Sequence, residues 1–132
     1  MERLEQRLEM ARRALTTFHE LSDLTSPTTV ERDAAIQRFE YTFEAVWKAA
    51  QRFLHVREGR AEGSPKGVIR GCREVGLMSD ADTTAALAMA DDRNLTVHTY
   101  NEALAIALYG RFGGHAALFD RWLAGLSTGS PP

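Results

Sequence analysis

The sequence lacks a second cysteine, because Cys72 is the single one among its 132 residues. One thiol cannot form a disulfide within the chain, and it cannot build a zinc site without other ligands. Histidines and carboxylates do not cluster at metal-ligand spacing, so we expect neither a metal nor another cofactor. Cys72 falls on the apolar side of a predicted helix, and we interpret it as a small core residue rather than a nucleophile.

Long apolar runs and an excess of positive charge are also missing. No apolar run approaches the roughly 20 residues that span a bilayer, and the charged, helix-like residues 1–7 argue against a signal peptide. We therefore expect a cytoplasmic protein without a membrane segment. The net charge is −2 with both signs interspersed. This argues against a general nucleic-acid coat protein, although a local cluster of cations could still bind RNA.

Strand-like alternation, internal repeats, a P-loop and a dinucleotide-binding fingerprint are absent as well. The sequence instead contains apolar residues at helical spacing, and 44% of its residues are hydrophobic, which is enough for a core. These patterns predict an all-α fold, an up-and-down antiparallel helical bundle of four long helical segments and one short helix. We expect a single domain over residues 1–126 and a disordered C-terminal tail over residues 127–132.

Capping residues indicate where the predicted helices begin and end. A first helix over residues 2–23 ends before Ser26-Pro27, because the residue before proline resists helical geometry. Thr28 and Glu31 fit a capping box for a second helix over residues 29–57, which is the most apolar and aromatic and should form the centre of the core. The other signals are a cap at Ser64 before Pro65, a stop at Gly76, a cap at Ser79 and a second capping box over residues 99–102.

Two groups of charged residues allow more than one interpretation. Glu40 and Glu44 lie one turn apart on the second helix, and paired carboxylates can bind a metal or act as acid and base. Without histidines at ligand spacing we favour a solvated helix face, and their role stays open. Lys66, Arg70 and Arg73 form a modest basic edge, for which a solvated surface is the default and phosphate contact the alternative.

The stretch from Arg93 to Tyr100 contains polar residues where a core helix would have apolar ones. On an unbroken helix Arg93 and His98 would lie about 140° apart, since five residues advance about 500°. Asn94 favours turns, and the capping box over residues 99–102 indicates a helix junction. In an extended segment His98 and Tyr100 would point to the same side. We therefore predict an exposed, irregular joint that presents these side chains together.

Several chemistries fit this joint. Arginine and histidine suit phosphodiester cleavage without a metal, because arginine stabilises the charged phosphorane and histidine moves the proton. The tyrosine could be a nucleophile, a hydrogen-bond donor or a modification target. The structural alternative is a group of polar contacts that joins two helices, with His98 buried and bonded to a backbone carbonyl.

The segment from Arg93 to Glu102 resembles the signature of the HEPN superfamily, and more closely its HepT-like branch, in which arginine, histidine and tyrosine follow at these spacings. That branch overlaps the nucleotidyltransferase substrate-binding proteins. Residues 38–49 and the Ser64-Pro65 helix start resemble the same family, and the resemblance spans roughly residues 4–126. The glycine-rich stretch over residues 110–114 departs from it, where a smoother helix is expected.

The resemblance implies a helical bundle that forms a homodimer and is encoded beside a minimal nucleotidyltransferase. In some members the HEPN protein is an RNA-cutting toxin, which the nucleotidyltransferase silences by transferring AMP to the motif tyrosine. Carried over to this chain, Arg93 and His98 would be the ribonuclease pair, Tyr100 the AMP acceptor and Asn94 a supporting polar residue. The alternative is a non-catalytic nucleotidyltransferase substrate-binding subunit.

Overall fold

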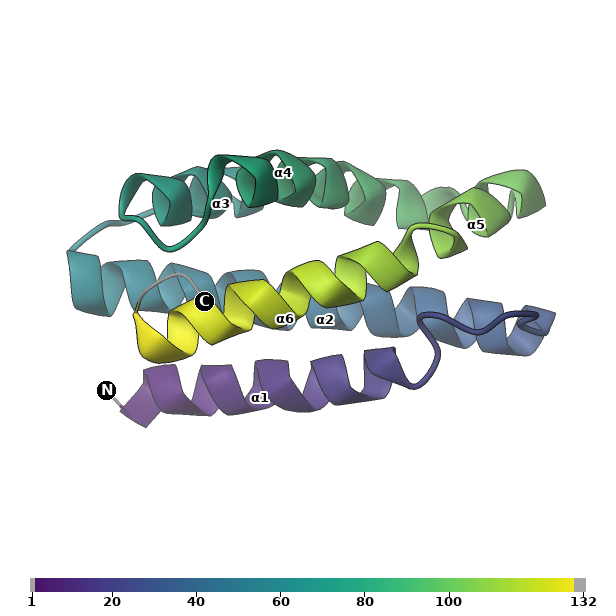
Figure 1. The fold of residues 1–132 in the computed structure, drawn as a ribbon, viewed down its shortest axis with the longest axis horizontal. Coiled ribbons are helices and arrows are strands. Elements are labelled where there is room, and N and C mark those ends of the chain that lie inside the picture. Colours follow the sequence, from purple (N-terminus) through teal and green to yellow (C-terminus); the bar gives the residue numbers. More distant parts are fainter. Residues whose placement is uncertain (1, 130–132) are drawn as a thin grey trace.

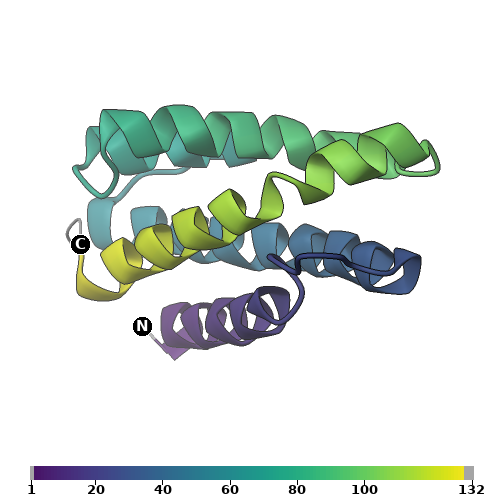
Figure 2. The ribbon, with the colours of Figure 1, turned by 45° about the vertical axis from the view of Figure 1, so that its right-hand side comes forward.

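The computed structural model describes residues 2–129, and every regular element in that range is a helix. The elements are α1 (Glu2–His19), α2 (Thr29–Glu58), α3 (Pro65–Glu74), α4 (Asp80–Leu95), the 3₁₀ helix η1 (Thr96–His98), α5 (Glu102–Tyr109) and α6 (Phe112–Thr128). The long helices lie side by side, and the start of α1 and the end of α6 are at the same end of the bundle (Figures 1 and 2). The predicted all-α bundle is confirmed.

Three helices begin at the caps that the sequence predicts. At α2, Thr28 Oγ1 accepts a hydrogen bond from the Glu31 backbone N–H at 3.1 Å, and Glu31 Oε1 accepts one from the Thr28 N–H at 2.8 Å. Ser64 accepts from the Gly67 N–H before α3, and Ser79 caps α4 in the same way. Each bond satisfies a backbone donor that the first helical turn would otherwise leave without a partner.

Two predicted boundaries are wrong. The first helix ends at His19 and not at residue 23. The cap of α5 is Asn101, whose side chain accepts a hydrogen bond from the Leu104 N–H at 3.0 Å. Asn101 has the extended backbone of a cap, with ψ at 111°, whereas Thr99 has ψ at 1°. The Thr99 hydroxyl instead donates to the carbonyl of Thr96 at 3.0 Å, so it stabilises the preceding turn.

The C-terminal helical segment is divided into α5 and α6 at the glycine-rich stretch. The break falls at Gly110 and Arg111, between α5 and α6, whereas Gly113 and Gly114 lie inside α6. Gly113 packs close to the loop after α1, because an added Cβ would lie 3.2 Å from Asp23 Oδ1. Helix α6 also includes residues 127 and 128, which the sequence analysis placed in a disordered tail, and residues 130–132 lie outside the described range.

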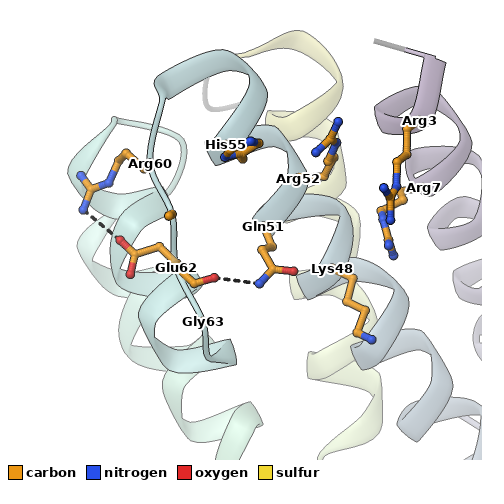
Figure 3. A pocket seen from close by; sticks show the side chains of 10 residues that line it. Arg3, Arg7, Lys48, Gln51, Arg52, His55, Arg60, Glu62 and Gly63 are labelled. Carbon is orange, nitrogen blue, oxygen red and sulfur yellow. Dashed lines mark hydrogen bonds and ion pairs between the residues drawn. The ribbon is translucent and has the colours of Figure 1, made fainter.

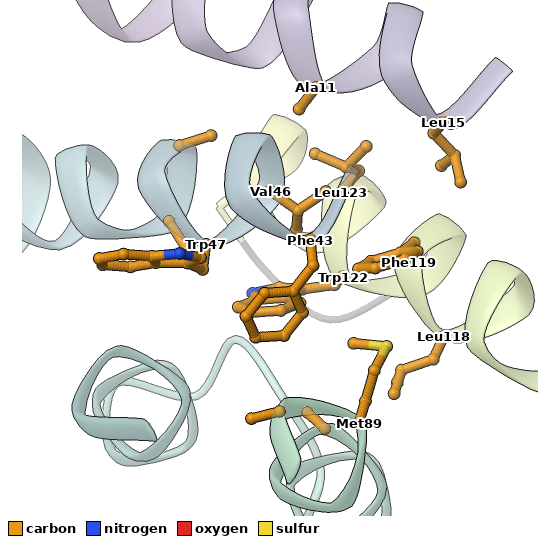
Figure 4. Close-up of a cluster of buried hydrophobic side chains, with 14 of the residues drawn as sticks. Ala11, Leu15, Phe43, Val46, Trp47, Met89, Leu118, Phe119, Trp122 and Leu123 are labelled. Atoms are coloured by element: carbon orange, nitrogen blue, oxygen red, sulfur yellow. The ribbon is translucent and has the colours of Figure 1, made fainter. Parts of the chain in front are cut away.

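Helix α2 is the centre of the core, as predicted, and packs against α1, α3, α4, α5 and α6. Its Phe43 and Val46 meet Phe119 and Trp122 from α6 and Met89 from α4 (Figure 4). Closer to α5, the rings of Phe39 and Phe112 stack with centroids 4.9 Å apart, and Phe18 meets Phe112 edge-on at 5.4 Å. Fully buried aromatic rings of this kind contribute large apolar areas to stability.

Cys72 on α3 belongs to this core. Its side chain is fully buried. Burial raises the pKa of the Cys72 thiol to about 11, and the nearby Trp122 side chain opposes the shift only in part. The thiol therefore stays protonated at neutral pH, and its predicted role as a packing residue fits this environment.

Candidate functional site

The segment around Arg93 forms an exposed joint between α4 and α5. It is irregular, but its backbone is a 3₁₀ turn followed by a bend rather than the extended strand that the sequence analysis considered. The ring centroids of His98 and Tyr100 still lie only 6.0 Å apart, in an edge-to-face arrangement. Tyr100 is 85% exposed and His98 is also exposed. This exposure excludes the purely structural alternative, in which His98 would be buried.

Arg93 is held against α2 by two carboxylates. Its Nη1 lies 3.5 Å from Glu40 Oε2, and its Nη2 lies 4.0 Å from Glu44 Oε1. Glu40 and Glu44 are partly exposed, so they form neither a buried acid pair nor a purely solvated face. In the structure these two carboxylates orient the Arg93 guanidinium. The Arg93 side chain remains 26% exposed.

Thr96 is a further residue that holds Arg93 in place, and it was not predicted as part of the site. This residue is buried, and its Oγ1 accepts a hydrogen bond from Arg93 Nη1 at 3.1 Å. The hydroxyl proton is shared between the Arg93 carbonyl at 2.7 Å and Glu40 Oε2 at 3.1 Å. A hydroxyl three residues after the arginine, one helical turn away, is the sequence signal that could have revealed it.

Asp92 is the second residue that sequence reasoning missed, and its side chain points to α6. It accepts two hydrogen bonds from Arg111, at 2.8 and 2.9 Å, and lies 2.7 Å from His115 Nε2. The His115 ring stacks on Phe39 with centroids 5.3 Å apart. Burial by itself would raise the pKa of Asp92, but the hydrogen bonds and charges of Arg111 and His115 outweigh it and lower that pKa. This paired, buried carboxylate fixes the end of α4 against α6.

The predicted site residues divide into two adjoining groups. Arg93 and Asn94 line a shallow cavity of about 350 Å³ between α2, α3 and α4. His98 and Tyr100 do not line this cavity and lie on the exposed surface beyond the end of α4. Within residues 2–129 the His98 ring makes no hydrogen bond, and its ring contact is with Tyr100.

A metal centre and a membrane segment find no support in the described residues. Between residues 2 and 129, no group of three or more histidine, cysteine, aspartate or glutamate side chains could hold a metal ion. In the same range no helix is both long and apolar enough to cross a membrane. The joint itself presents a guanidinium, an imidazole and a phenol, from Arg93, His98 and Tyr100.

The chain is similar to two proteins of known structure and to one protein family. A protein of known crystal structure from Thermus thermophilus is 57% identical, with a TM-score of 0.87 over 89% of this chain and 98% of that chain. A Haemophilus influenzae protein, described as having the fold of a substrate binding domain of a nucleotidyltransferase, is 21% identical, with a TM-score of 0.65 over 96% of this chain and 98% of that one. At that identity the likeness shows the fold alone. No curated protein matches the sequence. The model of the nucleotidyltransferase substrate binding protein like family matches residues 6–128, and the chain therefore belongs to that family.

Proposed function

We propose that this protein is the HEPN-type partner of a minimal nucleotidyltransferase and acts as the ribonuclease toxin of a toxin–antitoxin pair, silenced by AMP transfer to Tyr100. Family membership supports the partnership. The observation that carries the finer proposal is the exposed Tyr100 hydroxyl beside the exposed His98 ring, with the centroids 6.0 Å apart. A nucleotide attached to this tyrosine would cover the histidine.

AMP transfer would proceed by attack of the Tyr100 oxygen on the α-phosphate of ATP. A phosphodiester forms, pyrophosphate leaves, and the phenolic proton passes to a base that the nucleotidyltransferase supplies. The product adds one negative charge and a bulky nucleoside next to His98. By the same charge logic as phosphorylation, this group would repel RNA phosphates and block access to the joint.

RNA cleavage would use Arg93 and His98 without a metal. His98 moves the proton of the 2′-hydroxyl, and Arg93 stabilises the charge that develops on the phosphate. Arg93 can approach a phosphate only in competition with Glu40 and Glu44, which lie 3.5 and 4.0 Å away. In the proposed homodimer the partner subunit brings a second pair of the same residues to the substrate.

A second candidate function is a non-catalytic substrate-binding subunit. The ion pairs between Arg93 and the two glutamates favour it, because a neutralised guanidinium binds phosphate less strongly. In that case the cavity beside Arg93 and Asn94 would bind the nucleotidyltransferase or its substrate rather than cleave RNA.

One experiment with two measurements separates these functions. The purified protein is incubated with the nucleotidyltransferase encoded by the neighbouring gene, ATP and magnesium, and adducts are located by mass spectrometry. We expect AMP on Tyr100, no labelling of Tyr100→Phe, and unchanged labelling of Tyr41→Phe, which removes the hydroxyl of another exposed tyrosine. Labelling of the Tyr100→Phe variant, or an unlabelled wild type, would refute the role of Tyr100.

The second measurement follows cleavage of cellular RNA in EDTA. The toxin function predicts cleavage by the unlabelled wild type, loss of cleavage in His98→Ala, and products that end in a cyclic or terminal phosphate. Cleavage that needs magnesium would contradict the metal-free mechanism. If the wild type is labelled but never cleaves RNA, the non-catalytic subunit is the better description.

A further inference from the structure

A group of unpaired cations lines the groove between α1 and α2, on a part of the surface that the proposed function does not use. Arg3 and Arg7 lie one turn apart on α1, and Lys48 and Arg52 lie one turn apart on α2. The two helices place these pairs across the groove from each other (Figure 3). With residues 60–63 they enclose a cavity of about 380 Å³.

These four cations differ from most others in the chain. The sequence has 16 lysines and arginines, and nine of them form ion pairs with described carboxylates. Four of the remaining seven line this one groove. By contrast, Lys66 and Arg73 of the basic edge are neutralised by Asp91 and Asp80, at 2.6 Å each.

The one carboxylate among the described residues that line the cavity does not neutralise the four cations. Glu62 lines the cavity, but its carboxylate is paired with Arg60 at 3.2 Å, and its backbone carbonyl accepts a hydrogen bond from Gln51 at 2.7 Å. Figure 3 shows both contacts, with Arg52 and Lys48 on the other side of Gln51. Arg60 is also bonded to Glu74. The Gln51–Glu62 hydrogen bond therefore fixes one side of the cavity. The four unpaired cations face the open groove.

The arrangement of these four cations is electrostatically unfavourable. Like charges one turn apart on a helix repel each other, and here two such pairs face each other, although the whole chain carries a net charge of −2. An anion bound in the groove would relieve this repulsion.

The composition of the cavity indicates which anion fits. Three arginines and a lysine suit phosphate, because the planar guanidinium binds phosphate oxygens with two parallel hydrogen bonds. Among the described lining residues the one aromatic ring is that of His55, and no phenylalanine, tyrosine or tryptophan is present. The groove therefore lacks the row of aromatic rings on which the bases of single-stranded RNA usually stack. Several charges gathered in one cavity match a chain of linked phosphates better than a single one.

We propose that the groove formed by Arg3, Arg7, Lys48 and Arg52 binds the oligophosphate chain of a small molecule such as a nucleoside triphosphate. This site is separate from Tyr100, and the inference depends neither on RNA cleavage nor on AMP transfer. The site recognises the phosphates and not the base.

Isothermal titration calorimetry at low salt tests the proposal with tripolyphosphate, ATP, AMP and a short oligoribonucleotide. Tripolyphosphate and ATP should bind with similar affinity, AMP and the oligonucleotide should bind at least about tenfold more weakly, and binding should weaken as salt rises. Lys48→Gln with Arg52→Gln should lower the affinity for tripolyphosphate by at least about tenfold. The exposed Arg3→Gln, in the first turn of α1, serves as a second variant that keeps the core contacts intact.

Arg70→Gln is the matched control, because it removes one exposed, unpaired charge on another face. It should bind tripolyphosphate as the wild type does. Equal weakening by Arg70→Gln would show only general charge attraction and would overturn the site. Absence of tripolyphosphate binding, AMP binding as tight as that of ATP, or tighter binding of the oligonucleotide would each overturn it as well, the last in favour of an RNA groove.

Discussion

Asp92 and Arg93 follow each other in the chain, yet their side chains are held by different helices. Asp92 is bonded to Arg111 and His115 near the start of α6, whereas Arg93 is held by the carboxylates of α2. Consecutive helical residues point about 100° apart, so neighbours can face two sides of a bundle. At this position the end of α4 is fixed from both sides, and the exposed joint starts from a rigid base.

His115 makes the stability of the protein depend on pH. Burial lowers the pKa of the His115 imidazole, the charge of Arg111 lowers it further, and the contact with Asp92 only partly opposes the shift. In the unfolded chain a histidine binds its proton near pH 6.5, so below about that pH the unfolded state binds more protons than the folded one. Stability contributed by this group is therefore present above about pH 6.5 and is lost as the pH falls toward the folded pKa.

We expect the free energy of unfolding of the wild type to fall between pH 7.5 and pH 5, and His115→Gln to show a smaller fall. The glutamine amide can still donate to Asp92, so the variant should fold, with a stability at pH 7.5 lower by about 1–2 kcal/mol because a buried ring is lost. Urea denaturation at the two pH values measures both effects. His55→Gln, at an exposed position, should keep the wild-type difference, and an undiminished fall in His115→Gln would contradict the assignment.

Among the elements, α3 ends at a glycine whose backbone no other residue adopts easily. Gly76 has φ at +81°, its N–H donates to the Arg73 carbonyl at 3.0 Å, and the Leu77 N–H donates to the Cys72 carbonyl at 2.8 Å. An added Cβ would meet no atom within 4 Å. The penalty for another residue is therefore conformational and not steric.

Gly76→Ala should lower the free energy of unfolding by about 1 kcal/mol, since an L-residue in this left-handed conformation is strained by that amount. Thermal and urea denaturation measure the change. Gly63→Ala is the matched control, because its Cβ also enters open space and its φ is not in the left-handed region. The control should be neutral or slightly stabilising. Equal losses in both variants would show that φ is not the cause.

The elements were predictable from the sequence where the signals are local. A cap and the donor it satisfies lie within three residues, so the starts of α2, α3 and α4 could be read from Thr28, Ser64 and Ser79. The start of α5 was misplaced because Thr99 fits the same pattern as Asn101, and only the backbone conformation distinguishes them. The sequence pattern alone cannot supply that conformation.

The candidate site was only partly predictable, since its contacts join distant parts of the chain. Arg93, His98 and Tyr100 stand out locally, and their exposure agrees with a joint between helices. The residues that hold them do not stand out. Thr96 and Glu40 are 56 positions apart, and Asp92 and Arg111 are 19 apart. Their pairing depends on how α2, α4 and α6 pack, which periodicity does not determine.

For the whole molecule, the exposed large apolar side chains are concentrated in one stretch of the chain, the joint and α5. Four of the large ones fall between residues 95 and 106, and these are Leu95, Val97, Tyr100 and Ile106. Val97 and Ile106 are more than half exposed, at 66% and 53%. Apolar surface concentrated in this way often marks an interface, and the proposed homodimer would cover it while joining two copies of the joint.

Sedimentation equilibrium at micromolar concentration should therefore give about twice the chain mass of 14.7 kDa. Val97→Asp should shift the protein to the monomer, because a buried, unpaired charge opposes association. Met10→Asp places the same charge at an equally exposed apolar residue on α1 and should leave the dimer intact. A monomeric wild type would refute both the dimer and a site shared between subunits.

Because α4 is held in place at its end, an insertion or deletion within this helix should be poorly tolerated. At the other end of this helix Asp82 is bonded to Arg121 of α6, at 3.0 and 3.1 Å, so both ends are tied to fixed partners. Inserting or deleting one residue between Asp82 and Asp92 would turn the last part of the helix by about 100° and move it by about 1.5 Å. Asp92 would then miss Arg111, and Arg93 would miss Glu40, in a single event. Natural relatives should accordingly keep the number of residues in α4 constant.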